Sequence, residues 1–289
     1  MSVYLLCFSL SFTASLILTP LCILIAKRLG HIAFPSPRGW HQKPTPLLGG
    51  MALLVSFFIG FVFTVPNLNE FRWVILGSLF CFLLGLIDDV YHLKPYTKLI
   101  CQIAIAGFIL HENSWILLGF IVLIMNSFNL LDNMDGIAAG VSSLTALGVA
   151  FMGMAYHQNG VALAGLALAG ACGGFLVYNF HPAKIFMGDS GSLLLGFALS
   201  SLLVIPPHLP TSSLGHFFIL LLFLAIPLSD TFFVIYSRFK KGKPIIHGGQ
   251  DHLSHWILSR GFSPTMTVLS LYGLTLLSLV LAIVLCLYR

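Results

Sequence analysis

Long hydrophobic runs alternate along the chain with short stretches that hold most of the polar residues. A transmembrane helix needs about 20 mainly apolar residues to cross roughly 30 Å of hydrocarbon. The pattern predicts about ten such helices, a few of them short, at residues 3–26, 47–66, 71–87, 96–111, 114–128, 137–156, 161–179, 191–206, 215–236 and 265–287. An even number of spans puts both termini on the same side of the membrane.

The composition excludes a water-soluble protein. Only 8% of the residues are Asp, Glu, Lys or Arg, whereas soluble domains contain about 25%. Hydrophobic residues make up 58% of the chain, and because disordered chains are poor in such residues, disorder is excluded too. We therefore expect an all-α, polytopic membrane protein in which residues 1–289 form a single domain.

The basic residues indicate how the spans are oriented. Twelve of the 14 fall in connections on one side of this topology, and the positive-inside rule places that side in the cytoplasm, with both termini outside. These residues are Lys27, Arg28, Arg38, Lys43, Lys94, Lys98, Lys184, Arg238, Lys240, Lys241, Lys243 and Arg260.

The aspartates gather on the same side. All seven lie in or beside the cytoplasmic connections, whereas Glu70 and Glu112 lie in outer ones. Orientation does not explain this, because acidic residues contribute little to it. Carboxylates among basic loops predict a site for a cation and an anionic ligand. The net charge of +5 follows from these loops and does not indicate nucleic-acid binding.

Asp88 and Asp89 end the third predicted span, and Lys98 begins the fourth. Adjacent carboxylates beside hydrocarbon repel each other and resist desolvation unless a cation is near. One interpretation is a general base or metal-associated pair with a phosphate-binding lysine. The alternative is a capped helix end beside an interfacial lysine.

Asn129, Asp132 and Asp135 are spaced three residues apart, which would place them on one face if the segment is helical. Neither Lys nor Arg lies nearby in the sequence to form a surface ion pair. Asn and Asp also favour turns and helix caps, so a purely local structural role is the alternative.

Residues 179–192 (NFHPAKIFMGDSGS) form the most specific stretch. Gly188, Gly191 and the serines are expected to leave backbone N–H groups open at the start of the eighth span, which would form an anion site. Asp189 fits there only beside a cation, and Mg²⁺ uses one or two carboxylates together with water and phosphate oxygens. Phe186 is a candidate to stack on a base, with simple packing as the alternative.

The connection before the last span carries His252 and His255, with Asp251 adjacent. Histidines and carboxylates ligate zinc, but a third ligand at metalloprotease spacing is missing from the sequence. Diphosphate or lipid phosphate suits these histidines and the lysines at 240–243 better, and membrane orientation is the alternative for the lysines. Further candidates for ligand contact are the basic residues of the first connection: Arg38, His41 and Lys43.

Four segments, DDVYHLKPYTKL, NLLDNMDG, NFHPAKIFMGDSGS and DHLSH, follow one another in this order. They resemble the polyprenyl-phosphate N-acetylhexosamine-1-phosphate transferases (glycosyltransferase family 4), which include the phospho-MurNAc-pentapeptide translocases. The resemblance runs from about residue 35 to residue 260. It implies an enzyme of the bacterial inner membrane that moves a sugar-1-phosphate from a UDP-HexNAc to undecaprenyl phosphate on the cytoplasmic face and releases UMP. The family requires Mg²⁺, for which Mn²⁺ is a plausible substitute, and a homodimer is compatible with the sequence.

The resemblance also implies roles for individual residues. Asn129 and Asp189 match the metal-binding pair, and Asp88 and Asp89 match the acidic pair that activates the lipid phosphate. The remaining matches are expected to bind substrate: Lys98, Asp132, Asp135, Asn179, Phe186, His252 and His255, with Arg38 and Lys43 from the first connection.

Two positions depart from the family pattern. Ala33 stands near the place of an Asp, and the H-x-H-H motif is reduced to His252, Ser254 and His255. The missing histidine points away from a MurNAc-pentapeptide donor. A secondary transporter or lipid flippase is the rival interpretation, but such proteins bind near the bilayer midplane, and the predicted span interiors here are almost free of charge. A non-catalytic scaffold would not explain why every Asp lies on one side.

Overall fold

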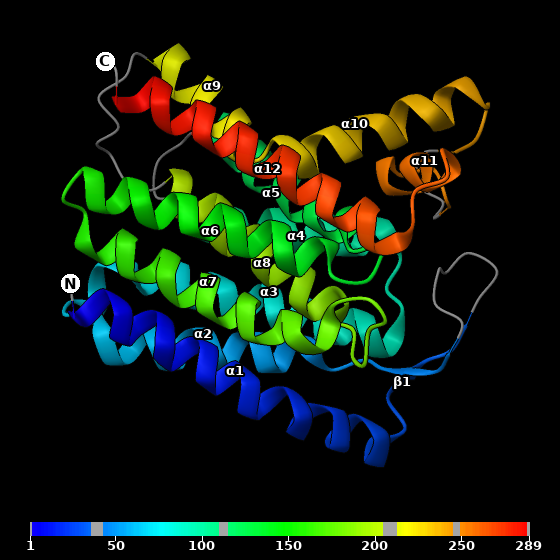
Figure 1. The fold of residues 1–289 in the computed structure, drawn as a ribbon, viewed down its shortest axis with the longest axis horizontal. Helices are drawn as coiled ribbons and strands as arrows, with labels where there is room; N and C mark the ends of the chain where they lie inside the picture. Colours follow the sequence, from blue (N-terminus) through cyan, green and yellow to red (C-terminus); the bar gives the residue numbers. More distant parts are fainter. Residues whose placement is uncertain (1, 36–42, 110–114, 205–212, 245–248, 288–289) are drawn as a thin grey trace.

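A computed structural model describes residues 2–35, 43–109, 115–204, 213–244 and 249–287. Within these ranges the protein is built almost entirely from α-helices, with one 3-10 helix, η1, and one short antiparallel strand pair (Figure 1). The elements are α1 (Ser2–Leu29), β1 (Ile32–Ala33), β2 (Thr45–Pro46), α2 (Gly49–Thr64), η1 (Leu68–Phe71), α3 (Arg72–Tyr91), α4 (Pro95–Ile109), α5 (Trp115–Leu131), α6 (Ile137–Ala155), α7 (Asn159–Asn179), α8 (Gly188–Val204), α9 (Ser213–Phe223), α10 (Ala225–Lys240), α11 (Leu253–Ser259) and α12 (Pro264–Leu287).

Nine of the ten predicted spans each coincide with one helix, namely α1 to α8 and α12. The prediction of one continuous helix over residues 215–236 is wrong, because the chain bends by 83° between α9 and α10. Pro227 supplies the reason. It has no N–H to donate to the carbonyl of Phe223, and its ring would clash with that carbonyl in a continuous helix, whereas the first turn of a new helix accepts proline.

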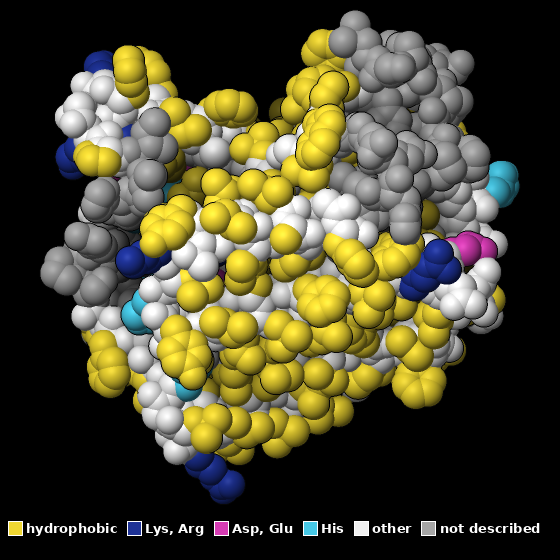
Figure 2. Space-filling view, turned by 180° about the vertical axis from the view of Figure 1, so that it is seen from behind, with side chains coloured by type: hydrophobic (Ala, Val, Ile, Leu, Met, Phe, Trp, Pro, Cys, Tyr) yellow, Lys and Arg dark blue, Asp and Glu magenta, His cyan; other side chains and the backbone are white. Residues whose placement is uncertain are grey.

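The helices are those of a multi-pass membrane protein. In the described part of the chain, α1, η1 with α3, α6, α7 and α12 are each long and apolar enough to cross a membrane, and the bent α9–α10 pair provides a sixth candidate. The helices α2, α5 and α8 are apolar but shorter. Hydrophobic side chains cover the middle of the face in Figure 2, with most charged side chains toward its ends. The start of α1 and the end of α12 lie at the same end of the molecule (Figure 1).

Helix α8 lies at the centre of the bundle. All its residues from Ser190 to Leu203 are buried, and α2, α3 and α5 pack around it. Close packing elsewhere depends on small residues, as is usual between membrane helices. A Cβ atom on Gly170 of α7 would lie 2.5 Å from the carbonyl oxygen of Phe8 in α1. The central helix carries Asp189 in its first turn, so the core packing also fixes the position of this carboxylate.

Candidate active site

A cavity of about 490 Å³ opens where α3 and α5 end and α8 begins. Five carboxylates from three separate segments line it, as the sequence predicted from their common side of the membrane. They are Asp88 and Asp89 of α3, Asp132 and Asp135 of the turn after α5, and Asp189 of α8.

Lys98 of α4 is not among the described residues that line the cavity, but it contacts two of these carboxylates. Its Nζ lies 2.8 Å from Asp88 Oδ2, forms an ion pair with Asp189 and donates to Asn129 Oδ1 at 3.1 Å. Asn129 donates from Nδ2 to Asp189 Oδ1 at 2.7 Å and to Ser192 Oγ at 3.0 Å. Lys98 is only 9% exposed, so these oxygens replace the water around its ammonium group. The predicted proximity of Lys98 to the acidic pair is confirmed.

The first N–H groups of α8 are occupied, so the prediction of an open anion site there is wrong. Asp89 Oδ1 accepts from the N–H of Asp189 at 2.7 Å, and Oδ2 accepts from the N–H of Ser190 at 3.1 Å. A carboxylate at a helix N-terminus also interacts favourably with the helix dipole. Gly188 permits this approach, since its φ is +70° and a Cβ atom would lie 2.5 Å from Asp89 Oδ2. The anion at this helix end is therefore the side chain of Asp89.

The segment after α5 is a turn, so a shared helical face for Asn129, Asp132 and Asp135 is not formed. Helix α5 ends at Leu131, and the turn alternative is correct for the two aspartates. Asp135 Oδ2 lies 2.8 Å from His181 Nδ1 and accepts from the N–H of Ala183 at 3.0 Å. Asp135 thus holds the loop that leads to α8.

Asn179 at the end of α7 supports the same loop. Its Nδ2 donates to the carbonyl of Ile185 at 2.9 Å, and its Oδ1 accepts from the N–H of Gly136 at 3.2 Å. Phe186 lines the cavity, and its backbone pairs with Pro46 of β2 and Gly49 of α2. The side chain of Asn179 and the backbone of Phe186 therefore hold the loop before α8 in place at the cavity.

The cavity has a surplus of negative charge. Burial raises the pKa of Asp132 to about 8, with contributions from the carboxylates of Asp189, Asp89 and Asp135. Such a cavity needs a further cation before it can admit an anionic ligand, because like charges repel strongly at short range.

The residues present fit Mg²⁺ as that cation. Asn129 and Asp189 lie side by side: Asn129 Nδ2 donates to Asp189 Oδ1, and the amide oxygen of Asn129 and Asp189 Oδ2 both face Lys98 Nζ. Mg²⁺ binds through one or two carboxylates with ligand and water oxygens completing its shell, so it would take the two oxygens that now face Lys98. Among the described residues, groups of three or more His, Cys, Asp or Glu that could hold a metal ion are absent. The other ligands would therefore come from water and from the bound substrate.

The two predicted histidines have different positions. His255 lines the cavity, and burial lowers its pKa. His252 is buried, with Nδ1 2.8 Å from Asp230 Oδ2, and the two imidazole rings are 5.5 Å apart. Asp230 Oδ1 also accepts from the N–H of Leu253 at 2.7 Å, so it fixes the start of α11.

Three further residues remain: Asp230, for which no role was predicted, and Lys43 and Arg38, which were predicted to bind substrate. Asp230 lies within the apolar run 215–236, where a lone carboxylate is a signal of a functional position. Lys43 is exposed and is not among the described residues that line the cavity. Arg38 lies outside the described residues.

Comparison with known proteins identifies the family. Residues 71–206 match the model of glycosyl transferase family 4. A Bacillus subtilis protein named probable undecaprenyl-phosphate N-acetylglucosaminyl 1-phosphate transferase is 31% identical over 300 residues, covering 96% of this chain and 84% of its own. The decaprenyl-phosphate N-acetylglucosaminephosphotransferase of Mycobacterium tuberculosis is 31% identical, covering 86% of this chain and 74% of its own. The phospho-N-acetylmuramoyl-pentapeptide-transferase of Prochlorococcus marinus is 29% identical, covering 96% and 89%. The chain therefore belongs to glycosyl transferase family 4.

Proposed function

We propose that the protein transfers a HexNAc-1-phosphate from a UDP-sugar to undecaprenyl phosphate and releases UMP. The observation that carries the proposal is the ion pairing of Lys98 with Asp88 and Asp189, two carboxylates that line a cavity at one end of the membrane helices. The names of the Bacillus and Mycobacterium relatives, which specify polyprenyl-phosphate acceptors, support the choice of acceptor.

The residues of the cavity divide the work of phosphoryl transfer. Asn129 and Asp189 would hold Mg²⁺, which neutralises charge on the diphosphate and on the phosphoryl group during transfer. Lys98 contacts the phosphate oxygens, and Asp88 keeps the acceptor phosphate deprotonated. An oxygen of the lipid phosphate attacks the sugar-bearing phosphorus, and the bond from that phosphorus to the bridging oxygen breaks, so that UMP carries the electron pair away. Asp89 positions Asp189 through the start of α8.

The orientation of the protein follows from its charge. Most basic residues lie at the end of the bundle that carries the cavity, so we place the cavity in the cytoplasm and both termini in the periplasm of a bacterial inner membrane. In this orientation the cavity meets the soluble UDP-sugar and the lipid phosphate at the same interface.

UMP release by the purified protein tests the proposal. The protein in detergent receives Mg²⁺, undecaprenyl phosphate and a panel of UDP-HexNAc donors, and UMP and the lipid-linked product are quantified. Turnover should require both substrates, stop with EDTA and return with Mg²⁺ or Mn²⁺.

Variants test the assigned residues. Asp88→Asn, Asp189→Asn and Lys98→Met should each abolish UMP release without unfolding the protein. The matched control is Lys94→Met, because Lys94 is exposed and lies one helical turn before Lys98. Normal turnover in Asp88→Asn or Asp189→Asn would refute the assignment, and transport of a substrate without UMP release would favour the transporter.

A further inference from the structure

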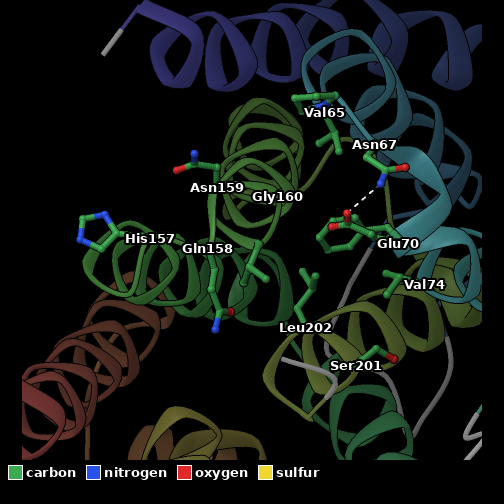
Figure 3. A pocket seen from close by; sticks show the side chains of 13 residues that line it. Val65, Asn67, Glu70, Val74, His157, Gln158, Asn159, Gly160, Ser201 and Leu202 are labelled. Atoms are coloured by element: carbon green, nitrogen blue, oxygen red, sulfur yellow. Dashed lines mark hydrogen bonds between the residues drawn. The ribbon is translucent and has the colours of Figure 1, made fainter. Parts of the chain in front are cut away.

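A second cavity, of about 540 Å³, lies outside the active site (Figure 3). We call it the η1 cavity, because η1 and the start of α3 form one of its walls. The other walls come from the connection between α6 and α7 together with the first turn of α7, at residues 157–161, and from Ser201 and Leu202 of α8. Segments far apart in the sequence thus converge on it.

The η1 cavity and the active site lie at opposite ends of the same helices. In α3, Val74 lines the η1 cavity and Asp89 lines the active site, 15 residues apart. At 1.5 Å per residue, this separation is about 22 Å along the helix. In α8, Ser201 lines the η1 cavity and Asp189 lines the active site. The η1 cavity is therefore a separate site at the other membrane interface.

The walls of the η1 cavity are partly apolar and partly polar. Phe71, Val74 and Leu202 supply hydrophobic surface. Asn67 and Glu70 lie together on one side in Figure 3, where Asn67 Nδ2 donates to Glu70 Oε1 at 2.7 Å. This bond leaves the second carboxylate oxygen of Glu70, which is exposed, available to an occupant.

Charge and hydrogen-bonding capacity select the occupant. Among the described residues that line the η1 cavity, Glu70 is the one carboxylate, His157 is the one residue that can become cationic, and Lys and Arg are absent. The hydroxyl of Ser201 is buried in the wall and lacks a hydrogen-bond partner among the described residues. An ammonium group offers three donors and a positive charge, whereas an anionic headgroup would be repelled by Glu70.

We propose that the η1 cavity binds a primary ammonium group carried on an apolar chain. The ammonium pairs with Glu70, and the chain lies against Phe71, Val74 and Leu202. An ethanolamine-headed phospholipid and a single-chain amine share this chemistry. The proposal is independent of the transferase activity, since none of its residues lines the active site.

Native mass spectrometry of the full chain in detergent tests this site. The protein is titrated with dioleoyl phosphatidylethanolamine, with dioleoyl phosphatidylglycerol and with decylammonium. Glu70→Gln removes the charge but keeps an oxygen for Asn67, so the local fold is preserved. Val161→Phe adds volume to the cavity wall. Leu276→Phe, on an exposed position of α12, is the matched control for added volume.

The wild type should bind the ethanolamine lipid more tightly than the glycerol lipid with identical chains. Glu70→Gln should weaken that binding about two- to five-fold, as expected for one exposed ion pair. Val161→Phe should weaken binding of the amine and the ethanolamine lipid, and Leu276→Phe should change neither. Thermal unfolding in the same detergent confirms that each variant is folded.

Two results would overturn the proposal. In the first, the wild type binds both lipids with equal affinity and does not bind decylammonium. In the second, the Glu70→Gln variant still prefers the ethanolamine lipid as strongly as the wild type does. Binding of decylammonium that depends on Glu70, without such binding of the phospholipid, would support the ammonium site and identify a single-chain amine as its source.

Discussion

The acidic pair at the end of α3 allows a sharp prediction, because its two members have different partners. Asp89 accepts the N–H groups of Asp189 and Ser190 with its two oxygens, whereas Asp88 accepts the N–H of Leu93 and pairs with Lys98. Asp89→Asn therefore removes half of a helix cap. Asp88→Asn leaves that cap intact, although the chemical change is the same.

The magnitude follows from the bonds that are lost. An asparagine at position 89 has one acceptor oxygen, so one N–H group of α8 loses a charged partner, at about 1.5–3 kcal/mol. Removing a negative charge from a helix N-terminus costs about 0.3–1 kcal/mol more. Relief of repulsion with Asp189 offsets part of this, so we expect a net destabilisation of about 2 kcal/mol for Asp89→Asn. For Asp88→Asn we expect less than about 1 kcal/mol. Its amide oxygen can still accept from Leu93, Lys98 keeps Asp189 as an ion-pair partner, and relief of repulsion between positions 88 and 189 offsets the lost ion pair.

Thermal unfolding and UMP release measure the two effects separately. Asp89→Asn should lower the Tm by roughly 4–8 °C, at about 2–4 °C per kcal/mol. It should also raise the Mg²⁺ concentration needed for half-maximal UMP release, because the backbone that carries Asp189 is displaced. Asp88→Asn should keep a Tm near that of the wild type and should lack activity at every Mg²⁺ concentration.

The reverse pattern would refute this reasoning. If Asp89→Asn unfolds at the wild-type temperature while Asp88→Asn is strongly destabilised, Asp89 does not cap α8 in the membrane. If Asp89→Asn is folded, binds Mg²⁺ normally and is inactive, Asp89 acts on the substrate itself.

Four other perturbations test separate contacts. Asp230→Ala leaves buried partners at the start of α11 without an acceptor and should cost about 2–4 kcal/mol, measured by thermal unfolding; an unchanged Tm would contradict this. Because the pKa of Asp132 is raised to about 8, the folded state binds this proton more tightly than the unfolded state does. Without divalent cations, stability should therefore fall as pH rises from about 4 to 8, and Asp132→Asn should flatten that fall in unfolding measured across pH. Gly188→Ala forces a side chain into positive φ and against a carboxylate, so stability should fall by more than about 1 kcal/mol and UMP release should drop. Ser254→Ala removes the 2.6 Å hydrogen bond to Asn133 at the cavity and should raise the KM for the UDP-sugar while kcat is kept, which initial-rate kinetics would show.

The hydrophobic pattern was sufficient for most of the fold. Each apolar run of adequate length became a helix, because a chain in hydrocarbon must satisfy its backbone hydrogen bonds internally. The pattern could not reveal the bend between α9 and α10, since Leu224 at the break and the residues on both sides of it are apolar. Pro227 was the available signal, but a proline alone does not distinguish a kink from a new helix.

The site shows the same division between local signals and tertiary contacts. The sequence predicted that the aspartates share one face of the membrane, because loop charge determines which connections lie together. It could not predict that Asp89 would occupy the start of α8, because that contact spans 100 residues and depends on the packing of α3 against the central helix. An open helix N-terminus and one filled by a side chain have the same local sequence. Where carboxylates outnumber the basic groups near them, tertiary packing decides which partner each carboxylate contacts. Substitution of one carboxylate at a time can therefore separate a residue that caps a helix from a residue that takes part in phosphoryl transfer.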